Sequence, residues 1–80
     1  MTKDEVISVI KKHILENLED IEEKDIDISK SMKEVGADSL DIIEVVSCSM
    51  RELNVKIPRT ELSEINTIEG LADKLLAHLD

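Results

Sequence analysis

Three stretches of aliphatic residues recur at the three- and four-residue spacing of a single helical face, and this spacing sets the fold class. They predict helices from about Lys3 to Leu18 and from about Ser39 to Leu53, and a last helix that begins after Asn66 or Thr67. The chain has only two glycines and one proline, which leaves few tight turns for an all-β fold. An all-α domain is therefore expected.

The predicted helix ends carry recognisable caps. Thr2 stands three residues before Glu5, which is the spacing of a capping box. Asp38 is a good N-cap for the second long helix, and Asp41 lies in its first turn, where a negative charge suits the helix dipole. Asn54 is the expected C-cap of that helix.

The helical period is lost between residues 19 and 38. A connection of this length needs its own apolar anchors, which we expect to be Ile21, Ile26, Ile28, Met32 and Val35. Within it, residues 25–28 alternate Asp and Ile, which favours a short extended stretch. After Pro58, residues 59–64 predict a short helix. The expected fold is one four-helix domain over residues 1–80, with three longer helices, one short helix and a long first loop.

Charge and composition exclude several classes of function. The chain of 80 residues has a formal net charge of −9, which disfavours binding to nucleic acid or to an anionic membrane. It contains no aromatic residue, so the core is aliphatic and no aromatic ring can stack a base. The N-terminal residues do not resemble a signal peptide, and no apolar run is long enough to span a membrane. One cysteine fits a reducing compartment, and we expect a cytoplasmic protein.

No pattern supports catalysis or metal binding. His13 and His78 lie near opposite ends of the chain, and neither comes with a nucleophile and oxyanion donors. Cys48 follows an acidic helix start rather than a basic one, so it is expected to be a small hydrophobe or a bystander. The acidic residues 25–29 fail as a calcium loop because Lys30 replaces the required glycine. No catalytic residue and no metal ligand are expected.

Ser39 has two interpretations from the local pattern. A serine at a helix start can simply help to cap it. Alternatively, its hydroxyl can carry a phosphoester, because free N–H groups and the positive dipole end at a helix N-terminus favour an anionic phosphate.

The segment Gly36-Ala37-Asp38-Ser39-Leu40-Asp41 resembles the attachment motif of acyl carrier proteins. The resemblance extends over nearly the whole chain, including its length, its acidity and its long first loop. Further like residues are Val35, Glu44, Ile57-Pro58 and the stretch Ile65-Asn66-Thr67-Ile68. The resemblance implies an acyl-carrier-type helix bundle that is monomeric when free. It also implies that the protein is a carrier and not an enzyme.

In that family the motif serine carries 4′-phosphopantetheine, which a magnesium-dependent phosphopantetheinyl transferase adds from coenzyme A. The resemblance therefore makes Ser39 the attachment residue, with Asp38 helping the transferase to position metal and serine. Acyl groups would be held on the arm as thioesters. The residues expected to face partner enzymes are Leu40, Asp41, Ile43, Glu44, Ser47, Met50 and Arg51. The residues expected to line an acyl pocket are Val45, Ser49, Leu53, Leu62, Ile65 and Leu71.

The chain departs from fatty-acid carriers at several positions. Met50 and Arg51 stand where acidic partner contacts are common, and Arg59 stands after Pro58 where an acidic residue is usual. Ser49 stands where a large aliphatic residue is expected. These changes suit a specialised carrier, so we expect a role in polyketide biosynthesis. One compatible role is that of donor carrier in β-branching.

The expected partners in a polyketide pathway are an acyltransferase, a ketosynthase or an enzyme resembling 3-hydroxy-3-methylglutaryl-CoA synthase, docking through basic patches. A fatty-acid carrier is the alternative pathway. A small acidic helical adaptor without a prosthetic group is the alternative from another class.

Overall fold

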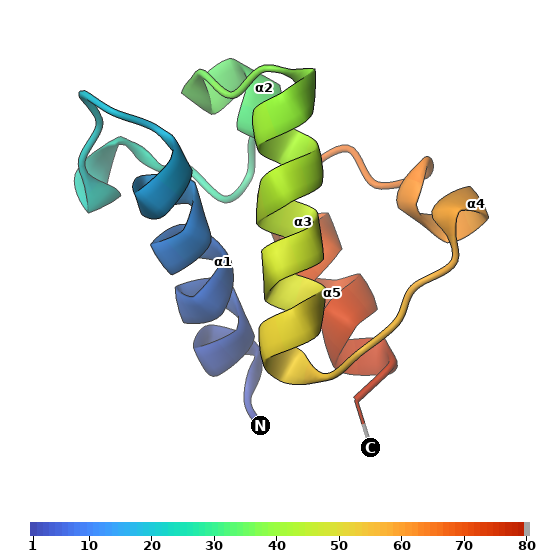
Figure 1. Cartoon of the computed structure of the whole chain (residues 1–80). Coiled ribbons are helices and arrows are strands. Elements are labelled where there is room, and N and C mark those ends of the chain that lie inside the picture. The colour runs from blue at the N-terminus through green and yellow to red at the C-terminus, as the bar shows by residue number, and fades with distance from the viewer. Residues whose placement is uncertain (80) are drawn as a thin grey trace.

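The computed structural model describes residues 1–79. The regular elements of these residues are all helices, which confirms the expected all-α class. Three longer helices, α1 (Lys3–Asn17), α3 (Ser39–Leu53) and α5 (Ile68–Ala77), form the body of the molecule (Figure 1). Between them lie the 3₁₀ turn η1 (Glu23–Asp25) and the short helices α2 (Met32–Val35) and α4 (Arg59–Leu62). The three longer helices, the short helix after Pro58 and the long first connection are confirmed, whereas η1 and α2, both within that connection, are additional elements.

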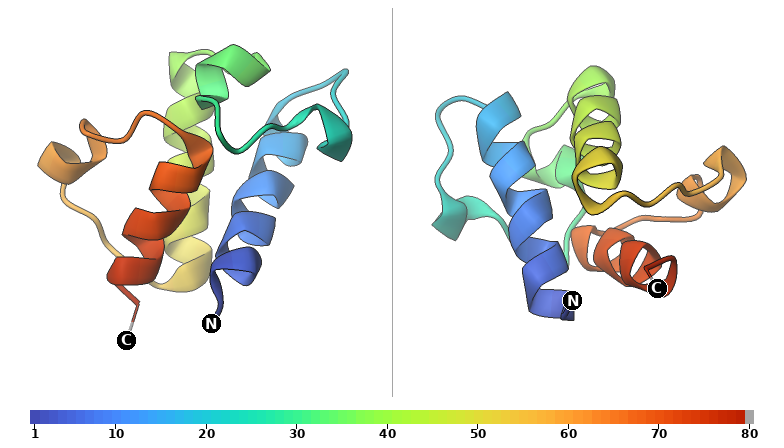
Figure 2. Two further views of the ribbon diagram at one scale, coloured as in Figure 1. Left: turned by 180° about the vertical axis from the view of Figure 1, so that it is seen from behind. Right: turned by 60° about the horizontal axis from the view of Figure 1, so that its bottom comes forward.

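Helix α1 packs against both α3 and α5, while α4 stands on the far side of α3 and α5 from α1 (Figure 2). The aliphatic stripes of the three longer helices meet in one core. Its fully buried aliphatic side chains are Val6, Ile10, Ile14, Val45, Ile68, Leu71, Ala72 and Leu75. The burial of these side chains supplies the main driving force for folding in a chain without aromatic residues.

The ends of the longer helices agree closely with the sequence pattern. Helix α3 has its predicted bounds, with the Asp38 carboxylate accepting a hydrogen bond of 2.9 Å from the Asp41 amide. Asn54 ends the helix in the left-handed conformation, with φ of 56°. Helix α1 ends at Asn17, one residue earlier than predicted.

Thr67, and not Asn66, caps α5. The Thr67 hydroxyl accepts a hydrogen bond of 2.9 Å from the Gly70 amide. Asn66 therefore forms no capping box with Glu69. Glu69 instead reaches across to Lys3, with 3.2 Å between its carboxylate and the ammonium group.

The first connection is attached to α5 through its backbone. The amides of Ile68 and Glu69 donate to the carbonyls of Lys30 and Ile28, at 3.0 and 2.8 Å. Two first-turn amides of α5, which have no partner within the helix, thus gain acceptors. The five predicted anchors all pack on the core, with Ile26 and Met32 buried and Ile21, Ile28 and Val35 partly buried.

The expected extended stretch at residues 25–28 is largely wrong. Asp25 belongs to η1 and Ile28 begins a turn, so only Ile26 and Asp27 lie outside both. The Asp27 carboxylate accepts hydrogen bonds from the Ser29 amide and hydroxyl, which favours the turn over a strand.

Helix α2 was missed because it is a single turn and too short to show periodicity. Its signal was nevertheless present, since Ser31 and Glu34 form a capping box and Gly36 follows the last helical residue. The helix after Pro58 ends at Leu62, two residues before the predicted end. Within residues 1–79, no helix combines the length and apolarity needed to cross a bilayer.

Candidate functional site

Ser39 is the first residue of α3, and the residues before it explain why its side chain is exposed. Gly36 ends α2 with φ of 123°, a conformation that glycine adopts readily, and Ala37 is buried at 3% exposure. Asp38 then supplies the N-cap. Capping by Ser39 is therefore wrong, and among residues 1–79 its hydroxyl takes part in no hydrogen bond.

The N-terminus of α3 is suited to an anionic group. The helix has 15 residues, so its first-turn amides and its dipole present a positive end beside Ser39. The Asp41 amide is already bound to Asp38 Oδ1, and the Asp38 amide is bound to Asp41 Oδ2 at 3.2 Å. This reciprocal pair fixes the backbone next to Ser39 and leaves the serine hydroxyl facing solvent.

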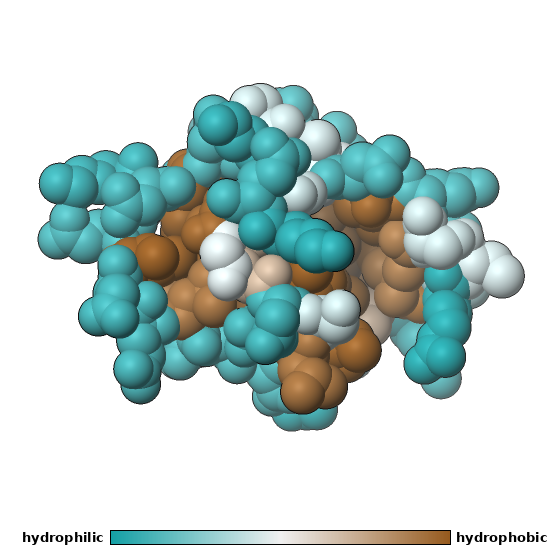
Figure 3. All heavy atoms as spheres, turned by 90° about the horizontal axis from the view of Figure 1, so that it is seen from above, coloured by the Kyte–Doolittle hydropathy of each residue, from teal (hydrophilic) through white to brown (hydrophobic). Residues whose placement is uncertain are grey.

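Two large apolar side chains are exposed close to Ser39. Leu40 is 77% exposed and Ile43, three residues further on the same helix, is 61% exposed. Such an arrangement is unusual unless the surface meets another molecule. Apolar surface is visible at this end of the molecule (Figure 3). Glu44 is exposed and Asp41 is partly exposed, so carboxylates accompany the apolar pair.

A cavity of about 590 Å³ lies between α3, α4 and α5. Its lining residues are Met32, Ile42, Ile43, Val46, Ser47, Met50, Ile57, Arg59, Leu62, Ser63, Ile65 and Leu71. A hollow with apolar walls is visible on the α4 side in the view from above (Figure 3). Because Ile42 and Ile43 lie about one turn from Ser39, the cavity begins beside the candidate attachment site.

Three of the six residues expected to line a pocket do line this cavity, namely Leu62, Ile65 and Leu71. Val45, Ser49 and Leu53 do not, because they follow each other at four-residue spacing on the buried face of α3. The cavity instead contacts the adjacent face, which carries Val46 and Met50.

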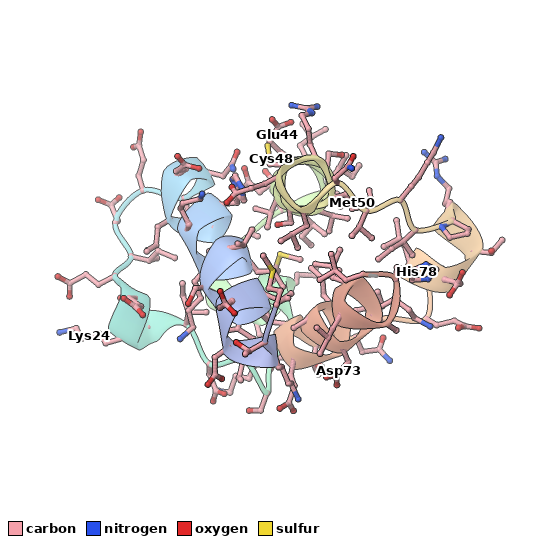
Figure 4. All side chains as sticks on the ribbon, turned by 90° about the horizontal axis from the view of Figure 1, so that it is seen from below. Lys24, Glu44, Cys48, Met50, Asp73 and His78 are labelled. Carbon is pink, nitrogen blue, oxygen red and sulfur yellow. The ribbon has the colours of Figure 1, made fainter. Side chains whose placement is uncertain are left out.

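The residues expected to face partners divide into two groups. Leu40, Glu44 and Arg51 are exposed on α3 and Asp41 is partly exposed, whereas Ile43, Ser47 and Met50 also line the cavity. Figure 4 shows Met50 on the side of α3 toward α4, while Glu44 and Cys48 lie on its outer edge. Met50 is therefore chiefly a wall of the cavity and only partly an outward-facing residue.

Ser49 and Cys48 do not form a reactive pair. Ser49 is fully buried, and its Oγ has no hydrogen-bond partner among the described residues. Cys48 Sγ lies 3.5 Å from Glu44 Oε1, and desolvation together with this hydrogen bond raises the pKa of the thiol. A thiol with a raised pKa is a poor nucleophile at neutral pH.

The histidines serve contacts between helices. His13 Nε2 lies 2.8 Å from Glu52 of α3, and His78 Nε2 lies 3.3 Å from Glu61 of α4. Glu52 also pairs with Lys12, and these hydrogen bonds, that of Lys12 first, lower the pKa of Glu52. Within residues 1–79, no group of three potential metal ligands gathers.

Comparison with known proteins agrees with this geometry. The family model described as phosphopantetheine attachment site matches residues 8–75. The chain is 33% identical over 75 residues to the polyketide biosynthesis acyl-carrier-protein AcpK of Bacillus subtilis (strain 168), a match that covers 94% of this chain and 92% of that protein.

A carrier of this family works with a phosphopantetheinyl transferase and with biosynthetic enzymes, and it bears the group without itself being a catalyst. The match argues against an adaptor that lacks a prosthetic group. The chain belongs to the family of phosphopantetheine-attachment domains, the acyl carrier proteins.

Proposed function

We propose that Ser39 is the attachment residue for 4′-phosphopantetheine and that residues 1–80 act as one acyl carrier domain in polyketide biosynthesis. The observation that carries the proposal is the exposed, unpartnered hydroxyl of Ser39 at the N-terminus of a 15-residue helix whose cap is supplied by Asp38. When bound, the group supplies a flexible arm whose terminal thiol holds an acyl chain as a thioester.

The residues around Ser39 fit this group. The positive end of α3 favours the phosphate of a phosphodiester on Ser39. Asp38 uses Oδ1 for the cap, and no hydrogen bond within residues 1–79 involves Oδ2. That second oxygen supports a role for Asp38 in holding the metal of the transferase complex next to the serine.

The cavity between α3, α4 and α5 is the proposed place of the acyl chain. Its walls are mainly aliphatic, which favours transfer of methylene groups out of water. The sequence expectation that Val45, Ser49 and Leu53 line the pocket is replaced by a lining from Ile42, Val46 and Met50.

The proposed docking surface is the exposed face of α3, from the turn beside Ser39 to the last turn of the helix. It consists of Leu40, Asp41, Ile43, Glu44 and Arg51, with Ser47 and Met50 at its border with the cavity. Carboxylates steer the carrier toward basic patches on partner enzymes, and the apolar pair gives each complex its contact area. The proposed partners include an acyltransferase, a ketosynthase or an enzyme resembling 3-hydroxy-3-methylglutaryl-CoA synthase.

The polyketide pathway is supported by the similarity to a polyketide carrier and by Met50 and Arg51, which interrupt the acidity of α3. Transfer of an acyl unit by polyketide enzymes should therefore be faster than transfer by fatty-acid enzymes. A strong preference for the fatty-acid enzymes would favour the alternative pathway. Function as a cytoplasmic monomer, and as donor carrier in β-branching, is part of the same proposal.

The attachment is tested by incubation with coenzyme A, magnesium and a broad-specificity phosphopantetheinyl transferase, followed by intact mass measurement. The wild-type chain should gain one phosphopantetheine group, and Ser39→Ala should gain none. Ser8→Ala, which removes an exposed serine from α1, is the matched control and should be modified like the wild type. An unmodified wild-type chain, or a modified Ser39→Ala, would overturn the proposal.

A further inference from the structure

The side chains that line the cavity between α3, α4 and α5 differ in charge from the acidic chain as a whole. Nine apolar side chains, two serines and Arg59 line it, and no acidic residue does, although the chain has 19 acidic and 10 basic residues. Arg59 is therefore the one charged group on the walls of a largely aliphatic space.

The charge of Arg59 is not used within the described part of the fold. Among residues 1–79, no carboxylate forms an ion pair with it. Glu61 lies two residues away on α4. Its Oε1 is 3.5 Å from Nζ of Lys74 in α5 and 3.3 Å from Nε2 of His78, which follows α5. His78 lies beside α4 in the view from below (Figure 4). The nearest acidic residue on the same helix is thus engaged elsewhere.

The serines of the cavity differ in what they offer. Ser63 Oγ donates to the Thr60 carbonyl at 2.8 Å, so its proton is already used. Ser47 Oγ takes part in no hydrogen bond with residues 1–79, and Ser47 stands on α3, across the cavity from α4. Arg59 is exposed to solvent and Ser47 is partly buried. Their donor groups have no partner among residues 1–79, and an occupant with acceptor atoms and negative charge would complement them.

We propose that this cavity favours acyl chains that end in a carboxylate over neutral chains of the same length, with Arg59 as the residue that sets the preference. The inference rests on the proposed acyl carrier function at Ser39. The aliphatic walls take the methylene groups, while the planar guanidinium of Arg59 holds the terminal carboxylate, a pairing that is stronger than a neutral hydrogen bond.

The test compares glutaryl and pentanoyl groups, which have the same number of carbons and differ in the terminal carboxylate. The transferase loads each from its coenzyme A thioester, and intact mass confirms the loading. The rate of thioester cleavage by hydroxylamine is divided by that of the same coenzyme A thioester in solution, which removes the difference in intrinsic reactivity between the two acyl groups. This relative cleavage rate then reports how far the protein shields each acyl group. In the wild type, we expect cleavage of glutaryl to be about fivefold slower than that of pentanoyl, as a partly exposed ion pair allows.

Three variants identify the source of the preference. Arg59→Gln should bring the two rates together, and Arg59→Lys should give an intermediate ratio because the charge is kept and the planar fork is lost. Lys56→Gln removes an exposed cation from the loop before α4, outside the cavity, and should leave the ratio unchanged. As a second readout, the Arg59 Nε–H resonance should shift with glutaryl and not with pentanoyl.

Equal cleavage rates in the wild type would overturn the inference, as would a preference that survives Arg59→Gln. So would an Arg59 resonance that responds only to a partner enzyme, because it would assign the residue to docking. These outcomes differ from failure of the proposed function, in which the transferase would load neither acyl group.

Discussion

On one flank of α3, the helix packs against α1 through side chains that are fully buried, including Ile10, Ile14 and Val45. On its other flank, α3 faces α4 and α5 across a cavity of about 590 Å³, lined by partly buried residues such as Met50, Leu62 and Ile65. The same amphipathic helix thus has one densely packed side and one loosely packed side.

The two sides divide stability from function. Dense packing with α1 holds α3 in place, since removal of atoms from a close-packed core is costly. The loosely packed side can accept a chain of methylene groups with little loss of existing contacts. The loosely packed side also lies next to Ser39. The part of the fold that can take up an acyl chain is therefore close to the proposed attachment site, while the densely packed part lies away from it.

The largest test of this contrast is a pair of truncations. Ile10→Ala, in the fully buried core, should lower the free energy of unfolding by about 3 kcal/mol. Leu62→Ala, at the cavity, should lower it by less than about 1.5 kcal/mol because its side chain is already partly exposed to the cavity and solvent. Urea unfolding followed by circular dichroism measures both. Equal losses would mean that the cavity side is packed as densely as the α1 side.

A smaller effect concerns the polar atom within the densely packed side. Ser49 Oγ is fully buried without a partner, so Ser49→Ala should raise the free energy of unfolding by about 1 kcal/mol. For a domain of this size, the melting temperature should rise by about 4–8 °C. Ser8→Ala, on the exposed face of α1, controls for the better helix propensity of alanine. A gain no larger than that of Ser8→Ala would show that Ser49 is satisfied in solution.

The smallest effect is the pH dependence of the contact between α1 and α3. Hydrogen bonds from Lys12 and His13 lower the pKa of Glu52 in the folded protein. The ionised Glu52 carboxylate therefore stabilises the fold above its unfolded pKa of about 4.3, and this contribution is lost as the pH falls through its folded pKa. Glu52→Gln should therefore lose less stability than the wild type between about pH 5 and pH 3. Unfolding curves across this range measure it.

Glu64→Gln is the control for Glu52→Gln, because Glu64 is exposed and forms no ion pair within residues 1–79. Parallel pH profiles for the wild type and Glu52→Gln would show that the contact does not persist in solution.

Much of the fold could be predicted because its signals are local. The bounds of α3 follow from Asp38, Asn54 and the aliphatic stripe between them, and each of these is visible within a few residues of the chain. Helix α2 was missed because one turn has no period, although Ser31 and Glu34 already formed its capping box. The choice of Thr67 over Asn66 as a cap depended on the hydrogen bond actually formed, which residue type alone does not decide.

The pocket shows where local reasoning ends. The apolar face of α3 is wide enough to contact two neighbouring segments. Its helical period does not show which flank of that face packs against α1 and which borders the cavity. For that reason, the residues expected to line a pocket include Val45, Ser49 and Leu53, which the structure places on the buried flank outside this cavity. Arg59 and Ser47 line the same cavity only because α4 folds back across from α3.

The sequence by itself determined the helical class, the caps and the exposed serine after Asp38, because helix period and capping act over three or four residues. Only the tertiary structure decided which flank of α3 is fully buried, that the Arg59 side chain lines the cavity, and which acidic side chains form ion pairs. Those depend on contacts between segments far apart in the chain, such as Glu61 with His78 and Glu52 with His13.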